Sequence, residues 1–110
     1  MTNIELNEQL VKLTGHMFRE GFWKLSDGSG FFTLPDFCSS LDLQAKWLWP
    51  TLREKGYHLE LTQWDDTFHA QLLDRLGNET DFMDCDCNPA KACALAITKL
   101  GKYLREAKND

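Results

Sequence analysis

The sequence predicts an α+β protein in which a small antiparallel β-sheet packs against three helices, in the order α-β-β-α-β-β-β-α. Three observations predict this class. Apolar residues recur at helical spacing in three segments, residues 57–63 and 67–73 alternate between apolar and polar, and turn-forming residues separate these segments. No linker, repeat or low-complexity stretch interrupts the 110 residues, so we expect a single domain over residues 1–110.

Composition limits the class of protein. Hydrophobic residues make up 43% of the chain and charged residues 26%, which is typical of a globular domain. The formal net charge of -5 opposes a phosphate backbone, so we expect no nucleic-acid partner. The start of the chain lacks a basic signal region, and no apolar run reaches the roughly 18 residues of a membrane span. We therefore expect a cytoplasmic protein, without membrane association, whose four cysteines are reduced.

The first helix is expected from Asn3 to about Gly15, which should end it. Its apolar side is expected to consist of Ile4, Leu10, Val11 and Leu13. Two aromatic runs, 21–25 and 31–34, then flank the turn formers of residues 26–30 and predict a β-hairpin.

The second helix begins after Ser39 or Ser40, either of which can cap its N-terminus. One apolar face is expected to hold Leu41, Ala45, Leu48 and Leu52, and a different face Leu43 and Trp47. Pro50 lacks an amide donor and should bend the helix near residues 46–47. Gly56 is expected to be the residue just beyond the C-cap.

The next two segments predict an antiparallel hairpin closed by Asp65-Asp66. In this register apolar residues meet apolar ones and polar residues meet polar ones, so a slip of one residue would mix the faces. The predicted pairs are Leu61 with Ala70, Leu59 with Leu72, Glu60 with Gln71 and Thr62 with His69. The face that carries His58, Glu60, His69 and Gln71 should be at least partly exposed to solvent.

The last third of the chain predicts a turn at Gly77-Asn78, a short strand at 80–83 within a long loop over 76–87, and a final helix opened by Asn88-Pro89. The inward side of this helix is expected to hold Ala92, Cys93, Ala96, Ile97, Leu100 and Leu104. Gly101 should fray or break its last turns. The basic residues of this end complement the dipole of a last helical turn.

The only dense group of candidate ligands is Asp84-Cys85-Asp86-Cys87 together with Cys93. Thiolates two residues apart on a strand share a face and could bind zinc, with Cys38 or a histidine completing the site. However, typical zinc sites use Cys-x2-4-Cys pairs, which this chain lacks, so we expect no metal or other cofactor. No nucleophile and base are placed for catalysis, and we expect a protein that is not an enzyme.

The aromatic residues exceed what one small core must absorb, and tryptophan is enriched at interface hot spots. The candidate partner-binding residues are Trp47, Leu43, Trp64 and Trp23. Their partner would be another protein or a second copy of the chain in a homodimer.

Several motifs, taken in order, resemble the phage ABA-sandwich domain family of short bacteriophage and prophage proteins. These motifs are Leu34-Pro35-Asp36-Phe37, Ser40-Leu41-Asp42, Ala45 to Pro50, Lys55-Gly56-Tyr57 to Leu61, and Asn88-Pro89-Ala90 to Leu100. The resemblance implies a sheet packed with helices and an accessory role in the cytosol of a bacterial host, and it supplies no catalytic residue.

The functional hypothesis is a non-enzymatic phage accessory protein that binds a host or viral protein or a small ligand, including a role in counter-defence. Two alternatives stay open. One is a small zinc- or thiol-dependent enzyme that uses Cys85, Cys87 and Cys93, and the other is a structural homo-oligomer.

Overall fold

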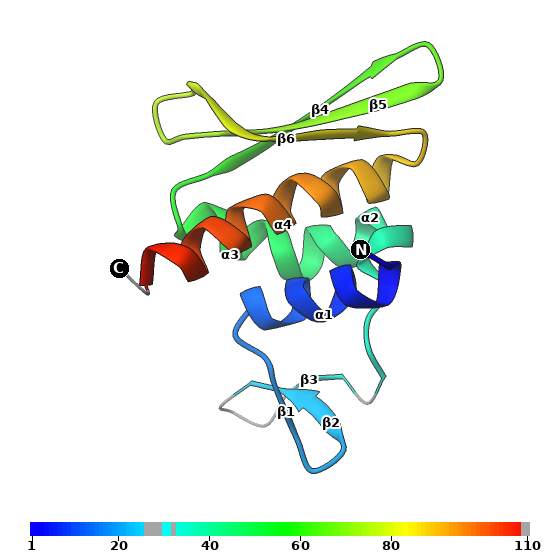
Figure 1. Ribbon diagram of the computed structural model, residues 1–110, viewed down its shortest axis with the longest axis vertical. Helices are drawn as coiled ribbons and strands as arrows, with labels where there is room; N and C mark the ends of the chain where they lie inside the picture. Colours follow the sequence, from blue (N-terminus) through cyan, green and yellow to red (C-terminus); the bar gives the residue numbers. More distant parts are fainter. Residues whose placement is uncertain (26–29, 32, 109–110) are drawn as a thin grey trace.

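The computed structural model describes residues 1–25, 30–31 and 33–108. Helices occupy the middle of the molecule, between two three-stranded antiparallel sheets (Figure 1). The helical elements are α1 (Asn3–Leu13), η1 (Phe37–Ser39), α2 (Leu41–Leu43), η2 (Gln44–Leu48), α3 (Trp49–Glu54) and α4 (Pro89–Lys108). The strands are β1 (Met17–Arg19), β2 (Phe22–Lys24), β3 (Gly30–Phe31), β4 (His58–Trp64), β5 (Thr67–Leu73) and β6 (Glu79–Asp86). Because α2, η2 and α3 are continuous, the α+β class and its three long helices are confirmed. The expectation of a single sheet was wrong, because the strands form two separate sheets.

Helix α1 begins with a capping box. The amide of Glu5 donates to Thr2 Oγ1 at 3.1 Å, and the Glu5 carboxylate accepts from the Thr2 amide in return. Gly15, with φ +91°, turns the chain at the other end, as expected from the sequence. The prediction for the buried side was wrong at Ile4, which is 65% exposed, because the core face is centred on Leu6, Leu10 and Val11.

The small sheet contains a strand that the sequence analysis missed. β1 pairs with β2 through a turn at Glu20 and Gly21, whose φ angles of 55° and 90° are those a tight hairpin turn requires. The predicted pairing of the two aromatic runs is confirmed by β2 and β3, in which Trp23 lies opposite Phe31. The turn predicted between them falls on residues 26–29, which lie outside the described residues.

The helical segment from α2 to α3 is capped by Ser40, whose hydroxyl accepts from the amide of Leu43 at 3.2 Å. Its middle is the π-helical turn η2, in which the amide of Trp49 donates to the carbonyl of Gln44, five residues earlier. Pro50 follows immediately and has no amide to donate. Where the sequence predicted a bend near residues 46–47, the structure has a π turn over Gln44–Leu48.

The π turn also changes which side chains of this segment are buried. Leu48 and Leu52 are buried as predicted, but Ala45 is exposed and Gln44 is fully buried in its place. One extra residue in a helical turn rotates the side chains before it relative to those after it. The segment ends as predicted at Gly56 (φ +90°), where the amides of Gly56 and Tyr57 donate to carbonyls of the last helical turn.

The larger sheet has the order β4-β5-β6 and confirms the predicted hairpin. All four predicted pairs are present: Leu61 with Ala70, Leu59 with Leu72, Glu60 with Gln71 and Thr62 with His69. The helices cover only one face of this sheet (Figure 1). The short strand predicted at 80–83 is confirmed as part of β6, which pairs with β5. The long loop expected over 76–87 was wrong, because β6 extends from 79 to 86.

Helix α4 is the centre of the molecule, since it packs against β5 and β6 on one side and α1 on the other. Asn88 caps it by accepting from the amide of Ala90 at 2.9 Å. The predicted inward residues are confirmed: Ala92, Cys93, Ala96, Ile97 and Leu100 are buried and Leu104 is half-buried. Gly101, however, does not break the helix, which continues to Lys108 because Gly101 is buried against the end of α1.

Two buried polar side chains join the helices. Gln44 Nε2 donates to the carbonyls of Phe37 and Ala90, at 2.7 and 2.8 Å. The side chain of Asn7 accepts from the amide of Cys38 at 3.1 Å. These bonds tie η2 to η1 and α4, and α1 to η1, and so satisfy backbone groups that the core would otherwise leave unpaired.

Candidate protein-binding surface

Three adjoining depressions follow helix α1. The first, about 730 Å³, lies between α1 and the small sheet and is lined by Glu8, Lys12, Gly15, His16, Met17, Phe18, Trp23 and Leu34. The second, about 380 Å³, is lined by Gln9, Lys12, Leu13, Lys55, Gly101, Leu104, Arg105 and Ala107. The third, about 590 Å³, is lined by Met1, Leu6, Gln9, Asp84, Leu95, Thr98, Lys99, Lys102, Arg105 and Glu106. Because neighbouring depressions share lining residues, we treat the three as one surface, the α1 surface.

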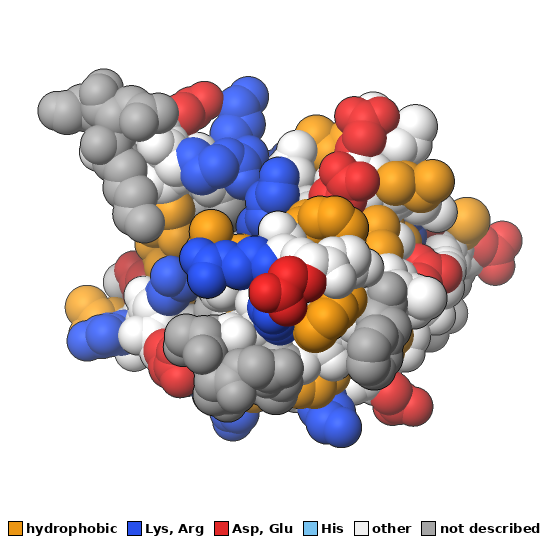
Figure 2. Space-filling model, turned by 90° about the horizontal axis from the view of Figure 1, so that it is seen from below, with side chains coloured by type: hydrophobic (Ala, Val, Ile, Leu, Met, Phe, Trp, Pro, Cys, Tyr) orange, Lys and Arg blue, Asp and Glu red, His pale blue; other side chains and the backbone are white. Residues whose placement is uncertain are grey.

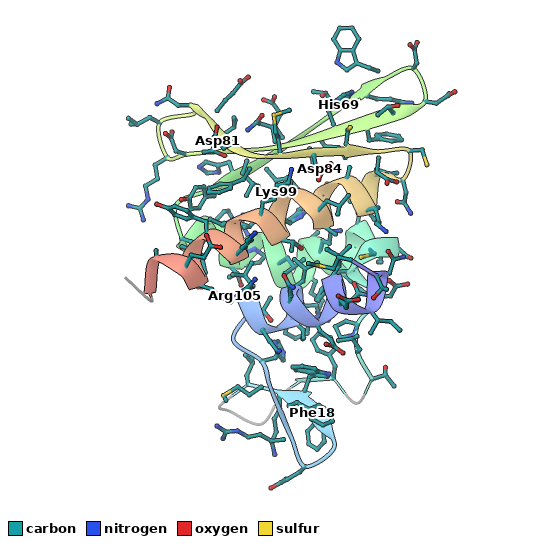
Figure 3. All side chains as sticks on the ribbon, in the orientation of Figure 1. Phe18, His69, Asp81, Asp84, Lys99 and Arg105 are labelled. Carbon is teal, nitrogen blue, oxygen red and sulfur yellow. The ribbon has the colours of Figure 1, made fainter. Side chains whose placement is uncertain are left out.

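Strand β1 supplies the apolar side chains at one end of the α1 surface. It is an edge strand whose three residues are all exposed, including Met17 at 55% and Phe18 at 60%. The Phe18 ring lies 5.3 Å from the ring of Trp23 on the neighbouring strand. Figure 3 shows Phe18 at the end of the molecule opposite the larger sheet. Exposed methionine and aromatic side chains beside a depression are typical of interfaces.

A buried histidine forms the base of the first depression. His16 is 1% exposed, and its Nδ1 lies 2.6 Å from the hydroxyl of Thr14. Its ring lies 5.0 Å from the ring of Phe31 and 5.6 Å from that of Trp47. These contacts hold the chain in place between the end of α1 and the start of β1. The base of the first depression is therefore formed by a well-packed side chain.

The charge of the α1 surface differs from that of the whole chain. Its cations are Lys12, Lys55, Lys99, Lys102 and Arg105, and its carboxylates are Glu8, Asp84 and Glu106. Five cations against three carboxylates give a formal charge of +2, on a chain whose net charge is -5. Figure 2 views the molecule from the side of the small sheet and shows Lys and Arg side chains gathered beside hydrophobic ones.

The gathering of cations has a local cause. The second depression lies where the C-terminal ends of α1, α3 and α4 meet, at Leu13, Lys55 and Arg105. A cation near a helix C-terminus is stabilised by about 0.3–1 kcal/mol through the helix dipole. The sequence predicted a basic C-terminal end for the last helix. In the structure this end meets the C-terminal ends of α1 and α3. In the third depression, Lys99 is paired with a carboxylate, since its Nζ lies 3.3 Å from Asp84 on β6 (Figure 3).

The structure does not bring the four predicted partner-binding residues together. Trp23 lines the first depression. Trp47 and Leu43 are half-buried against the core, and the Trp47 ring lies 4.9 Å from the ring of Phe31. Trp64 is 71% exposed at the end of β4, in the other sheet. The residues that the sequence analysis missed are Met17 and Phe18, and their signal was the turn former Gly21, three residues after Phe18.

The three thiols of the alternative enzyme hypothesis also lie apart. Cys85 is exposed opposite His69, on the sheet face away from the helices, and Cys87 is exposed beyond the strand. Cys93 is buried beside Ala70 on the helix side, where burial raises its pKa to about 11. Within residues 1–25, 30–31 and 33–108, no group of three or more His, Cys, Asp and Glu side chains could hold a metal ion.

The uncovered face of the larger sheet carries the four polar residues expected there and is exposed as predicted, together with the apolar residues Trp64 and Met83. His58 and Glu60 are exposed, while His69 and Gln71 are half-buried. Figure 3 shows where His69 lies in the larger sheet. The side-chain amide of Gln71 donates to the carbonyl of Thr80 at 2.6 Å. This face brings two histidines to one side of the hairpin, and the exposed thiol of Cys85 lies opposite His69 on the neighbouring strand.

The fold is thus an α+β domain with its helices between two antiparallel sheets. No family model, curated protein or solved structure matches this chain. None of the helices in the described part of the chain is both long enough and apolar enough to cross a membrane.

Proposed function

We propose that this protein is a non-enzymatic binding module that holds an acidic, apolar segment of a partner protein along the α1 surface. The observation that carries the proposal is the union of three depressions with an apolar lining and cationic borders along one helix. An elongated partner segment can occupy all three, whereas a compact small ligand would use only one.

The apolar part of the proposal rests on the first depression. Its volume of about 730 Å³ is large enough for several side chains of a partner. Met17 and Phe18 stand exposed at its border, and Trp23 lines it. Aromatic residues provide much of the binding free energy at protein interfaces, and methionine adapts its shape to the surface it meets.

The acidic part rests on electrostatics. A partner segment with carboxylates would meet Lys12, Lys55, Lys102 and Arg105 along the second and third depressions. The rest of the chain is strongly acidic and would repel the same segment elsewhere, so charge favours one site and one orientation. Complementary charge of this kind raises association rates and selects against wrong partners more than it raises affinity.

The resemblance to phage ABA-sandwich proteins supports a biological setting for this module. On that basis, we propose that it is an accessory protein of a bacteriophage or prophage, acting in the host cytosol on a host or viral protein, for example in counter-defence. The separation of Cys85 from Cys93 by the sheet gives no support to the thiol or zinc enzyme, so we do not propose it.

The test uses a synthetic amphipathic peptide with Leu and Phe on one helical side and Glu on the other. A matched peptide carries Lys at every Glu position. We expect calorimetric titration to show binding of the acidic peptide only. Phe18→Ser and Lys12→Glu should each weaken binding by about tenfold or more, as hot-spot substitutions do.

The control variants carry the same changes at positions away from the α1 surface. Trp64→Ser removes an exposed aromatic residue of the other sheet, and Lys46→Glu reverses an exposed charge of η2. Both should bind the acidic peptide as the unchanged protein does. The proposal is wrong if neither peptide binds, if both bind equally, or if the control variants lose binding to the same extent.

A further inference from the structure

Strand β4 is an open edge of the larger sheet. In the described part of the chain it pairs with β5 alone, and six of its seven residues are exposed. Leu61 is 37% exposed although it points to the helix side of the sheet, and Trp64 is 71% exposed. Unpaired backbone donors and acceptors along such an edge can pair with a strand of another chain.

The two edges of this sheet differ in their protection. β6 carries the carboxylates of Glu79, Asp81, Asp84 and Asp86, and its pairing with β5 is irregular between Gln71 and Leu73. β4 has a single carboxylate, Glu60, no lysine or proline, and an unbroken register over all seven residues. Charges and irregularities prevent edge-to-edge pairing, so β6 is protected against it and β4 is not.

We propose that two copies of this chain form a dimer by antiparallel pairing of their β4 strands, which makes one continuous six-stranded sheet. A two-fold axis perpendicular to the sheet, between the two Leu61 residues, keeps the helices of both copies on the same side. Each residue of β4 then faces a residue on the same side of the sheet, as pairing requires.

In this register the side chains of the two β4 strands are compatible with one another. Leu61 meets Leu61 of the second copy, Glu60 meets Thr62, Leu59 meets Gln63 and His58 meets Trp64. All seven residues of the strand are paired. A two-fold centred on Glu60 would pair only five and would place two carboxylates directly opposite each other, which is unfavourable.

The dimer would cover side chains that one copy leaves exposed. The two Leu61 side chains would pack together on the helix side of the joined sheet, and each Trp64 would lie against His58 of the second copy. The small sheet lies at the end of the molecule opposite the larger sheet (Figure 1). The first depression, which is lined by residues of the small sheet, would therefore remain accessible in both copies. Self-association through β4 would therefore leave the first depression free for a partner.

The first test measures the mass of the purified protein by sedimentation over a range of concentrations. The unchanged chain should rise from 12.7 kDa towards twice that mass as its concentration increases. Leu61→Lys places two cations opposite each other and should remain at 12.7 kDa. Met83→Lys, at an exposed position of β6, should dimerise like the unchanged chain, and circular dichroism shows whether both variants are folded.

The second test examines the register through Thr62, which faces Glu60 of the second copy in the proposed dimer. Thr62→Lys creates two opposite-charge pairs and should strengthen dimerisation by about two- to thirtyfold, while Thr62→Glu should weaken it by a similar factor. Adding Glu60→Gln should remove most of both effects. A chain that stays at 12.7 kDa at all concentrations, or a dimer that responds to neither Leu61 nor Thr62 substitutions, would overturn the proposal.

Discussion

At the scale of single residues, two glycines differ in whether the structure requires them: a side chain would be strained at Gly56 but would fit at Gly101. Gly56 has φ +90°, and a Cβ there would lie 2.5 Å from Arg75 Nε. Gly101 lies inside α4, where a Cβ would meet Arg105 Nη1 at 3.7 Å and Leu13 Cδ1 at 4.0 Å, both ordinary contacts. The first glycine is required by the backbone of the turn, whereas the second has room for a methyl group.

We therefore expect Gly101→Ala to raise the free energy of unfolding by up to about 1 kcal/mol, because alanine loses less backbone entropy in a helix than glycine does. Gly56→Ala should lower it by about 1 kcal/mol or more, since alanine is strained in the left-handed region. Thermal unfolding of both variants tests this, with the unchanged chain as reference. A lower melting temperature for Gly101→Ala would show that the contact between α4 and α1 leaves no room there.

At the scale of elements, the π turn before Pro50 determines which side chain of this helix enters the core. It replaces the expected Ala45 with Gln44, whose amide bridges η1 and α4 through two hydrogen bonds. The contacts of the π turn η2 with η1 and α4 thus depend on the buried side chain of Gln44.

We expect Gln44→Ala to lower the free energy of unfolding by about 2–4 kcal/mol, because it removes both hydrogen bonds and leaves a cavity. Lys46→Ala, at an exposed position of the same turn, should change it by no more than about 0.5 kcal/mol. Urea denaturation of the two variants measures both values. An equal effect of the two substitutions would mean that the Gln44 bonds do not support the core.

At the scale of the whole molecule, contacts are concentrated on α4. This helix packs against β4, β5, β6, α1 and η1. By contrast, all three residues of β1 are exposed, and the small sheet consists of strands of two or three residues. Local opening therefore requires far less free energy at the small sheet than at α4. The α1 surface joins the most and the least stable parts of the fold.

Hydrogen exchange followed by mass spectrometry should show this difference. Amides of α4 and β5 should exchange slowest, near the rate set by global unfolding, and those of β1 and β2 should exchange fastest. If the acidic peptide of the proposed test binds, it should slow exchange in β1 and leave β6 unchanged. Equal protection of β1 and α4 without peptide would contradict this account of where the stability lies.

Much of this fold could be predicted from the sequence because its strongest patterns are local. The hairpin of β4 and β5 has the predicted register, since alternation over two strands and a two-residue turn allow only one match of faces. The caps at Ser40, Gly56 and Asn88 were likewise predictable from residue type. Strand β1 was missed because three residues carry too little periodicity, and only Gly21 marked the turn after it.

The candidate site was less predictable, because it depends on which elements meet. The sequence by itself determined the element types, the turns, the hairpin register and the inward side of α4, all of which follow from propensity and periodicity within a short segment. Only the tertiary structure decided that the ends of three helices converge, that Met17 and Phe18 border the first depression, and that Trp47 is packed inside while Trp64 is exposed. The reason is physical: exposure and proximity are set by packing between segments distant in the chain, which no local pattern encodes.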